Sequence, residues 1–170
     1  VDSLFLQHNS PYTKKSITIR SCKPSDAIPK YDESGNIVSQ YTARFEIQTY
    51  TPQYVTVCWR KNTYETQRVD WGETVVFEYD MVNSQDNELI VYCAGNLKYI
   101  GDCSGLNPTS VDIGNANRLL EFICEDSDQL VKADLSKNVY LRKASFNNCS
   151  VMGTASGGSN VLDVSDCTNL

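Results

Sequence analysis

The sequence predicts an all-β protein, an antiparallel β-sandwich with a long first loop and a loose C-terminal tail. Three runs of alternating apolar residues, YVTVCW, ETVVFEY and ELIVYC, lie close together between residues 54 and 93. Alternation with a period of two buries one face of a strand, and polar turns separate the runs. No long amphipathic helix with caps is visible, nor is an internal repeat of solenoid length. Short strands with frequent turns are typical of a sandwich or a small barrel.

The first third of the chain predicts two strands on either side of a long loop. Residues 1–15 have little periodicity and are interpreted as an N-terminal arm. Residues 16–22 and 43–49 alternate between apolar and polar side chains, as half-buried strands do. Between them, residues 23–40 combine two prolines and a glycine with many charges, which predicts a loop.

The middle of the chain predicts the core of the sandwich. Residues 54–60, 74–81 and 88–93 are expected to form core strands, because each places its apolar side chains on one face. Residues 63–69 are rich in β-forming residues but polar, which suits an edge strand. We expect five side chains to meet between two stacked sheets: Val57, Trp59, Phe77, Leu89 and Val91.

The last third of the chain has weaker patterns. Residues 96–112 contain Gly101, Gly105 and Pro108, and the apolar run that resumes at 119–124 fits either a strand or a short helix. Residues 138–143 alternate and predict a last strand. Residues 153–160 are rich in Gly and Ser and predict a flexible link to a short VLDV segment.

A chain of 170 residues is expected to be one domain. The sandwich is assigned to residues 16–146, after the arm at 1–15. Residues 147–170 form the Gly/Ser-linked tail, which a disulfide would tie down.

Part of this pattern resembles a C2 domain. The family has a Tyr-Val-x-Val strand and then a Thr-rich edge strand, and this chain has YVTV at 54–57 and TYET at 63–66. The family then has an aromatic-Asn-Glu turn followed by alternating apolar residues that end in Phe, and this chain has WGETVVF at 71–77. The family's Leu-x-Val strand and Ile-Gly step correspond to LIV at 89–91 and Ile-Gly at 100–101. The resemblance covers about half of the chain and implies a C2-like sandwich. Immunoglobulin-like and jelly-roll sandwiches remain alternatives, although the order of cysteine and tryptophan does not match immunoglobulin domains.

The resemblance also implies a calcium-independent domain. Calcium-binding C2 domains hold the ion with loop aspartates, because a hard cation needs several carboxylate oxygens. The matching positions here are Pro52, Cys93, Gly95 and Lys98, none of which carries a carboxylate. A site built instead from Asp32, Glu33 and Asp102 is the less favoured alternative, since these acids are scattered. We therefore expect no metal and no cofactor.

Calcium-independent C2 domains often bind anionic phospholipid through a basic face, which makes peripheral membrane binding the preferred functional hypothesis. The expected contact residues are three cations and three loop side chains: Arg60, Lys61, Arg68, Tyr31, Leu97 and Tyr99. Further candidate loop-tip residues are Ile37, Val38 and Tyr41. The alternatives are an extracellular protein-interaction or adhesion domain, and a structural domain of a larger protein.

Other classes of function are disfavoured by the composition. The net charge of −6 argues against nucleic acid, since phosphate backbones require clustered positive charge. No apolar run is long enough for a transmembrane helix. The only histidine, His8, has no acid or cysteine at catalytic or ligand spacing, and no GxSxG motif occurs, so we expect no enzyme.

Seven cysteines, none in a close CxxC pair, predict disulfides and a secreted, extracellular or secretory-lumen location. The expected pairs are Cys93 with Cys103 and Cys149 with Cys167, and Cys22 and Cys58 are further candidates. Asn148 fits the N-glycosylation pattern. The alternative is that the cysteines are reduced and act as small apolar residues.

Overall fold

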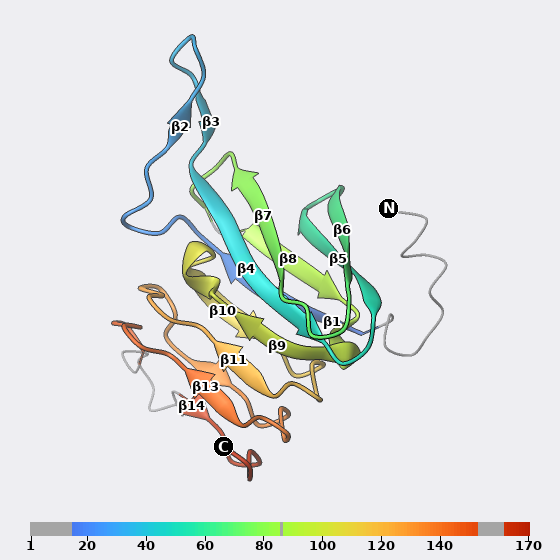
Figure 1. Cartoon of the computed structure of the whole chain (residues 1–170). Coiled ribbons are helices and arrows are strands. Elements are labelled where there is room, and N and C mark those ends of the chain that lie inside the picture. Colours follow the sequence, from blue (N-terminus) through green and yellow to red (C-terminus); the bar gives the residue numbers. More distant parts are fainter. Residues whose placement is uncertain (1–14, 86, 153–161) are drawn as a thin grey trace.

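The computed structural model describes residues 15–85, 87–152 and 162–170 and confirms the all-β sandwich (Figure 1). Most of the predicted arm lies outside these ranges. The strands of the first half are β1 (Ser16–Ser21), β2 (Lys30–Tyr31), β3 (Ile37–Ser39), β4 (Tyr41–Thr49), β5 (Gln53–Arg60), β6 (Thr63–Val69), β7 (Val75–Met81) and β8 (Asn87–Tyr92). Those of the second half are β9 (Leu97–Gly101), β10 (Pro108–Asp112), β11 (Glu121–Ile123), β12 (Ala133–Asp134), β13 (Lys143–Ser145) and β14 (Leu162–Asp163).

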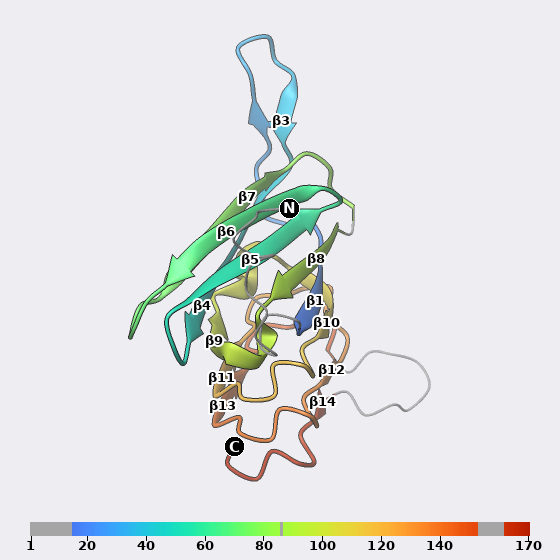
Figure 2. The same cartoon turned by 90° about the vertical axis from the view of Figure 1, so that its right-hand side faces the viewer.

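Two five-stranded sheets pack face to face (Figure 2). Their strand orders are β10-β1-β8-β5-β6 and β13-β11-β9-β4-β7. All pairings in the first sheet are antiparallel, as are β4 with β7 and β4 with β9 in the second. The three core strands predicted from alternation correspond to β5, β7 and β8, and the predicted polar edge strand is β6.

The five predicted core side chains are fully buried in one cluster, so this prediction is confirmed. At its centre, Phe45 of β4 stacks on Phe77 at 5.6 Å and meets Trp59 edge-on at 5.7 Å between ring centroids. Such aromatic pairs add about 0.5–1.5 kcal/mol beyond the burial of their area. The Trp59 indole N–H donates to Glu65 Oε2 at 2.9 Å, which pairs its one polar atom.

The C-terminal part is built differently from the antiparallel sandwich that the sequence predicts. Strands β9, β11 and β13 run parallel, with Tyr99, Glu121 and Lys143 side by side in register (Figure 1). Neighbours in this stack are 22 residues apart. On the other side, β12 and β14 also pair in parallel. Successive coils stacked through parallel ladders form a short β-solenoid, which continues the second sheet of the sandwich.

The expectation of no internal repeat is therefore wrong. Equivalent turns recur in three coils, where the amide of Ala116 donates to Ile113 O at 3.0 Å and that of Asn138 to Leu135 O at 2.9 Å. The third copy, at Cys167 and Val164, has the same bond at 3.0 Å. The third copy follows the second by 29 residues, whereas the second follows the first by 22. This unequal spacing, together with the different residue types at equivalent turn positions, hides the repeat in the sequence.

Because the C-terminal part is a solenoid, its strands differ in position from those that the sequence predicts. Residues 119–124 contain the strand β11, which decides between strand and helix. The strand expected over 138–143 is displaced, because residues 138–142 turn the coil and β13 begins at Lys143. Within the predicted tail, β14 pairs with β12 and Cys167 is buried. Most of the predicted Gly/Ser link lies outside the described residues.

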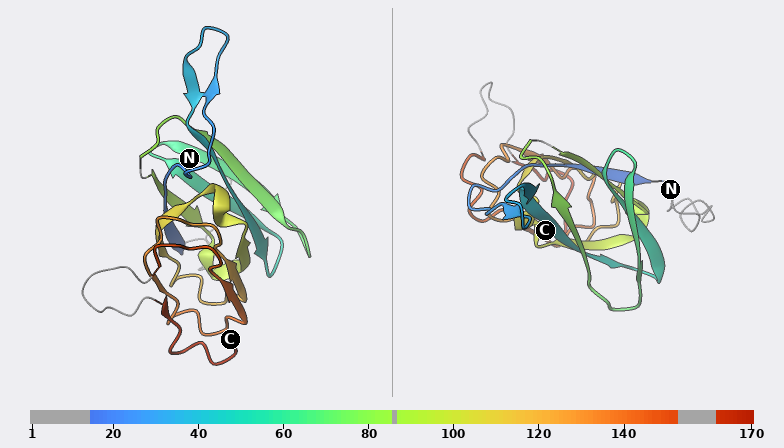
Figure 3. Two further views of the ribbon diagram at one scale, coloured as in Figure 1. Left: turned by 90° about the vertical axis from the view of Figure 1, so that its left-hand side faces the viewer. Right: turned by 90° about the horizontal axis from the view of Figure 1, so that it is seen from above.

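The predicted first loop contains the two-stranded hairpin β2-β3, which projects away from the two sheets (Figure 3). Its turn is ordered by Asp32, whose Oδ1 accepts the amides of Ser34 and Asn36, both at 2.9 Å. Gly35 has a φ of +83°, a conformation that glycine adopts without steric cost.

The only helices among the described residues are two three-residue 3-10 turns, η1 (Ala94–Asn96) and η2 (Cys103–Gly105). Neither has the length or apolar character needed to cross a bilayer.

No disulfide joins any of the seven cysteines, all of which lie within the described residues, and this corrects the predicted disulfides. Cys93 precedes η1 and Cys103 begins η2, so the whole of β9 lies between them in the chain. Five extended residues span roughly 16 Å, whereas a disulfide requires a Cα separation of about 4–7 Å. Cys149 and Cys167 occupy different corners of the solenoid, where they contact Cys124 O at 3.2 Å and Leu135 O at 3.1 Å, respectively.

The remaining candidates, Cys22 and Cys58, do not form a disulfide with each other either. Cys22 follows β1 and contacts Asn107 O at 3.4 Å, whereas Cys58 lies within β5 and contacts Arg60 O at 3.2 Å. The alternative interpretation, reduced cysteines used as small side chains, describes their place in the fold. The predicted secretory location stays a prediction.

Candidate functional site

The projecting hairpin and its surroundings contain a group of exposed apolar side chains. Five of the ten large hydrophobic side chains exposed among the described residues belong to the hairpin, to the segment leading into it, or to the residue just after β7. We call them the hairpin surface: Ile28, Tyr31, Ile37, Val38 and Val82. Ile28 is 84% exposed and Tyr31 is 60% exposed. An exposed cluster of apolar side chains on a projecting element is typical of a contact surface.

The hairpin is anchored to the sandwich by polar contacts at its base. Lys30 pairs with Asp80 Oδ1 at 2.9 Å, and the Thr42 hydroxyl donates to the same oxygen at 2.7 Å. The hydrogen bond from Lys30, which has the larger effect, and the one from Thr42 lower the pKa of the Asp80 carboxyl. The amide of Gln40 donates to Met81 O at 2.6 Å, which fixes the entry into β4. The hairpin surface is thus carried on a fixed support.

An acidic hollow lies beside the base of the hairpin. Its volume is about 570 Å³, and its lining includes residues 24–27, Tyr41 of β4 and the coil residues Asp126 and Asp128. Asp128 accepts a bond from Asn107 Nδ2 at 2.8 Å. Asp126 accepts one from the Asn148 amide at 2.9 Å, and Asn148 is the predicted glycosylation residue, for which glycosylation stays a prediction.

Together, the hairpin and hollow form an apolar surface with an acidic border. Between residues 24 and 38 the sequence has three acids, Asp26, Asp32 and Glu33, and one cation, Lys30. That cation is already paired with Asp80. The local field is therefore negative and favours a cationic partner.

The predicted membrane-binding cations are not brought together. Arg60 and Lys61 lie at the turn between β5 and β6, whereas Arg68 lies near the far end of β6, opposite Tyr54. Arg68 is bound to Asp70 at 2.9 Å and lies over the Tyr54 ring at 5.4 Å from its centroid.

The predicted loop side chains also separate in the structure. Leu97 is fully buried in the core, so it offers no contact surface. Tyr99 is half-buried on β9, where its hydroxyl donates to Glu46 Oε2 at 3.3 Å. Tyr41 is buried, whereas Tyr31, Ile37 and Val38 do share the hairpin. The sequence thus identified part of the surface but joined it to residues that lie elsewhere.

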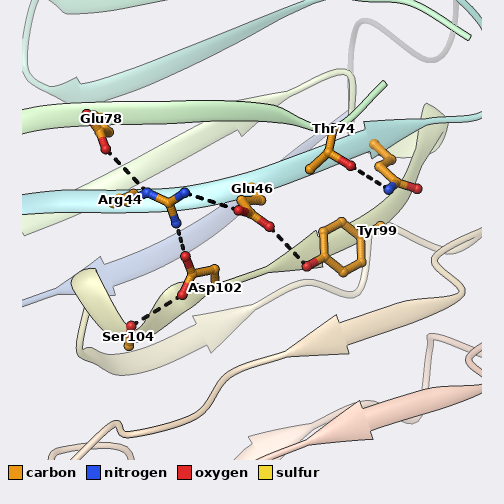
Figure 4. Close-up of polar contacts among 8 residues, drawn as sticks. Arg44, Glu46, Thr74, Glu78, Tyr99, Asp102 and Ser104 are labelled. Carbon is orange, nitrogen blue, oxygen red and sulfur yellow. Dashed lines mark hydrogen bonds and ion pairs between the residues drawn. The ribbon is translucent and has the colours of Figure 1, made fainter. Parts of the chain in front are cut away.

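A second polar cluster surrounds Arg44 on the outer face of β4 (Figure 4). Its guanidinium pairs with Glu46 at 3.1 Å, with Glu78 at 3.3 Å and with Asp102. Burial, and to a smaller extent the nearby Glu46 carboxylate, raises the pKa of Tyr99 to about 12. Three carboxylates already surround the cation, so we interpret this cluster as a structural link between β4, β7 and the end of β9 rather than a ligand site.

The alternative calcium acids do not meet. Asp102 is engaged with Arg44, whereas Asp32 and Glu33 lie on the projecting hairpin. Within residues 15–85, 87–152 and 162–170, no three acids, cysteines or histidines are grouped as metal ligands.

The sequence did not single out Ile28 and Val82 of the hairpin surface, nor Asp26, Asp126 and Asp128 of the acidic hollow. Ile28 had a usable signal, since an isolated isoleucine before a proline in a polar loop has no strand to bury it. Asp126 and Asp128 had no such signal in the sequence, because stacking of the solenoid coil places them near residues about 100 positions earlier in the chain.

No family model, curated protein sequence or solved structure matches this chain. The resemblance to C2 domains therefore stays a prediction.

Proposed function

We propose that this chain is a non-catalytic recognition module that binds a protein partner through the hairpin surface and the adjoining acidic hollow. The observation that carries this proposal is that half of the large hydrophobic side chains exposed in the described part of the chain lie on and around one projecting hairpin. Interfaces commonly combine an apolar centre with a polar rim, and here the rim is acidic. The complementary partner presents apolar side chains flanked by Lys or Arg.

The charge distribution favours a protein over an anionic phospholipid. Each Lys or Arg near an anionic membrane contributes about 1 kcal/mol of attraction, and each acid opposes it. The hairpin segment has an excess of acids, and its one cation is paired. Arg60 and Lys61 lie at a different turn, away from Arg68. Binding to phospholipid is therefore the competing hypothesis, and the experiments must distinguish it from binding to a protein.

A matched pair of peptides tests the charge and apolar requirements together. One is a short peptide of alternating Lys and Val, and the other replaces every Lys by Glu. We expect the Lys/Val peptide to bind and to perturb the NMR signals of the hairpin, and binding should weaken as salt is raised to about 0.15 M. The Glu/Val peptide should not bind.

Substitutions locate the contact. The double variant Ile28→Ser, Tyr31→Ser should weaken binding about tenfold, since few residues dominate an interface. Val139→Ser is the control, because Val139 is also exposed but lies on the solenoid. Both variants should keep the wild-type unfolding midpoint.

Vesicle sedimentation tests the competing hypothesis of phospholipid binding. Salt-sensitive binding to vesicles containing phosphatidylserine, lost in the double variant, would replace the protein proposal by the phospholipid hypothesis. Binding of neither peptide nor vesicles would remove the hairpin as a recognition surface.

A further inference from the structure

A second hollow, on a different face, gathers cations in this otherwise acidic protein. Its volume is about 640 Å³, within the range of small-ligand sites. Its lining contains three cations, two tyrosines, an amide and a leucine: Lys15, Arg118, Arg142, Tyr50, Tyr140, Asn117 and Leu120. No carboxylate is among them. We call this hollow the Arg118 groove.

The solenoid stack creates the groove. Arg118 and Tyr140 are separated by one 22-residue coil, as are Leu120 and Arg142. The amide of Arg142 donates to Leu120 O at 2.8 Å, which holds the two coil corners side by side. The end of β4 adds Tyr50, and the residue before β1 adds Lys15. Four distant segments thus place their cations and rings on one site.

Part of the groove is held in place before any ligand arrives. The Arg118 guanidinium lies over the Tyr50 ring at 4.3 Å from its centroid, and the Tyr50 hydroxyl donates to Arg118 O at 2.6 Å. These contacts limit the movement of two long side chains, which lowers the entropy lost on binding. Among the described residues, Lys15 and Arg142 take part in no ion pair.

We propose that the Arg118 groove binds a carboxylate-bearing sugar of an acidic carbohydrate chain. A guanidinium matches the two oxygens of a carboxylate in a bidentate arrangement, and Arg142 is exposed for this contact. Tyr140 is 56% exposed, and its ring offers a flat apolar surface to the C–H face of a sugar ring. Asn117 supplies a donor and an acceptor for hydroxyls. An acidic peptide would use the cations but not the ring and amide together.

Oligogalacturonate is the probe, with a neutral galactose oligomer as its matched control. Titration calorimetry should show binding of the acidic oligomer only, weakening as salt approaches about 0.15 M. Arg142→Gln and Tyr140→Ala should each reduce the affinity about tenfold or more, since a charge-assisted bond or a buried ring contact is lost. Lys137→Gln is the control, because Lys137 is an exposed cation of the same coil outside the groove.

Each alternative outcome has a defined meaning. Equal binding of a poly-glutamate peptide would overturn the carbohydrate class and assign the groove to acidic peptides. Binding that survives Arg142→Gln and Tyr140→Ala would place the site elsewhere, and no binding of either anion would overturn the site itself. The hairpin variant Ile28→Ser, Tyr31→Ser should bind oligogalacturonate normally, which keeps this test separate from that of the proposed protein partner.

Discussion

Asn138 lies at a buried corner of the solenoid and offers a sharp test of how the coils are joined. It is fully buried, and its Nδ2 donates to Ile113 O and Ala116 O of the preceding coil, both at 3.0 Å. In the next coil Cys167 repeats the arrangement, with Sγ contacts to Leu135 O at 3.1 Å and Asn138 O at 3.4 Å. A side-chain donor thus connects each of these coils to the one before it.

Asn138→Asp keeps the shape of the side chain but removes its N–H donors. A protonated carboxyl retains one donor, so at low pH the variant should lose one hydrogen bond, about 1 kcal/mol. An ionised carboxylate would face two carbonyl oxygens inside the core. Burial should therefore raise the pKa of this carboxyl, by about three units or more at a fully buried position.

The raised pKa determines the sign of the pH dependence. The unfolded chain ionises near about pH 3.9, while the folded variant holds its proton to higher pH. The added destabilisation is absent below the unfolded pKa and grows as pH rises, by about 1.4 kcal/mol per unit until the folded pKa is reached. At about pH 7 the total loss is about 5 kcal/mol, comparable with the whole stability of many domains.

Urea unfolding followed by tryptophan fluorescence measures this loss, because Trp59 is fully buried. The variant is compared with the wild type at the same pH, from about pH 4 to about pH 7. Asn169→Asp is the control, since Asn169 is exposed, and it should show no such trend. A stability difference for Asn138→Asp that stays constant over this range would refute the role assigned to the Asn138 amide.

Two further predictions concern β9 and the thiols. Gly101→Ala should destabilise the protein by about 1–3 kcal/mol, because the new Cβ would overlap the Tyr99 phenol ring. Spectrophotometric titration should show the pKa of Tyr99 falling from about 12 as the displaced ring moves away from Glu46. An unchanged titration would contradict this packing. Burial raises the pKa of both Cys93 and Cys124 to about 12, so a thiol reagent at about pH 8 should label them only after unfolding. Mass mapping that found Cys93 in a disulfide would instead restore the oxidised state that the sequence suggested.

The sequence alone was sufficient for the centre of the sandwich. Strands β5, β7 and β8 are each long enough for alternation to be visible, and period-two alternation buries Val57, Phe77 and Leu89 whatever the partner strands are. It was insufficient for the solenoid, because β11 and β13 have only three residues each, too few to show a period. The repeat lies instead in turn positions such as Ala116, Asn138 and Cys167, whose residue types differ.

The candidate sites were decided by tertiary structure. Tyr31, Ile37 and Val38 were visible as exposed loop residues. Only the fold separates them from Leu97 and places them on a projecting hairpin, just after Ile28 in the segment that leads into it. A sequence pattern reports which face of a strand is apolar, since that depends on neighbours two positions away. Which distant segments share a surface depends on how strands pair and coils stack, and here those pairings join residues tens of positions apart in the chain.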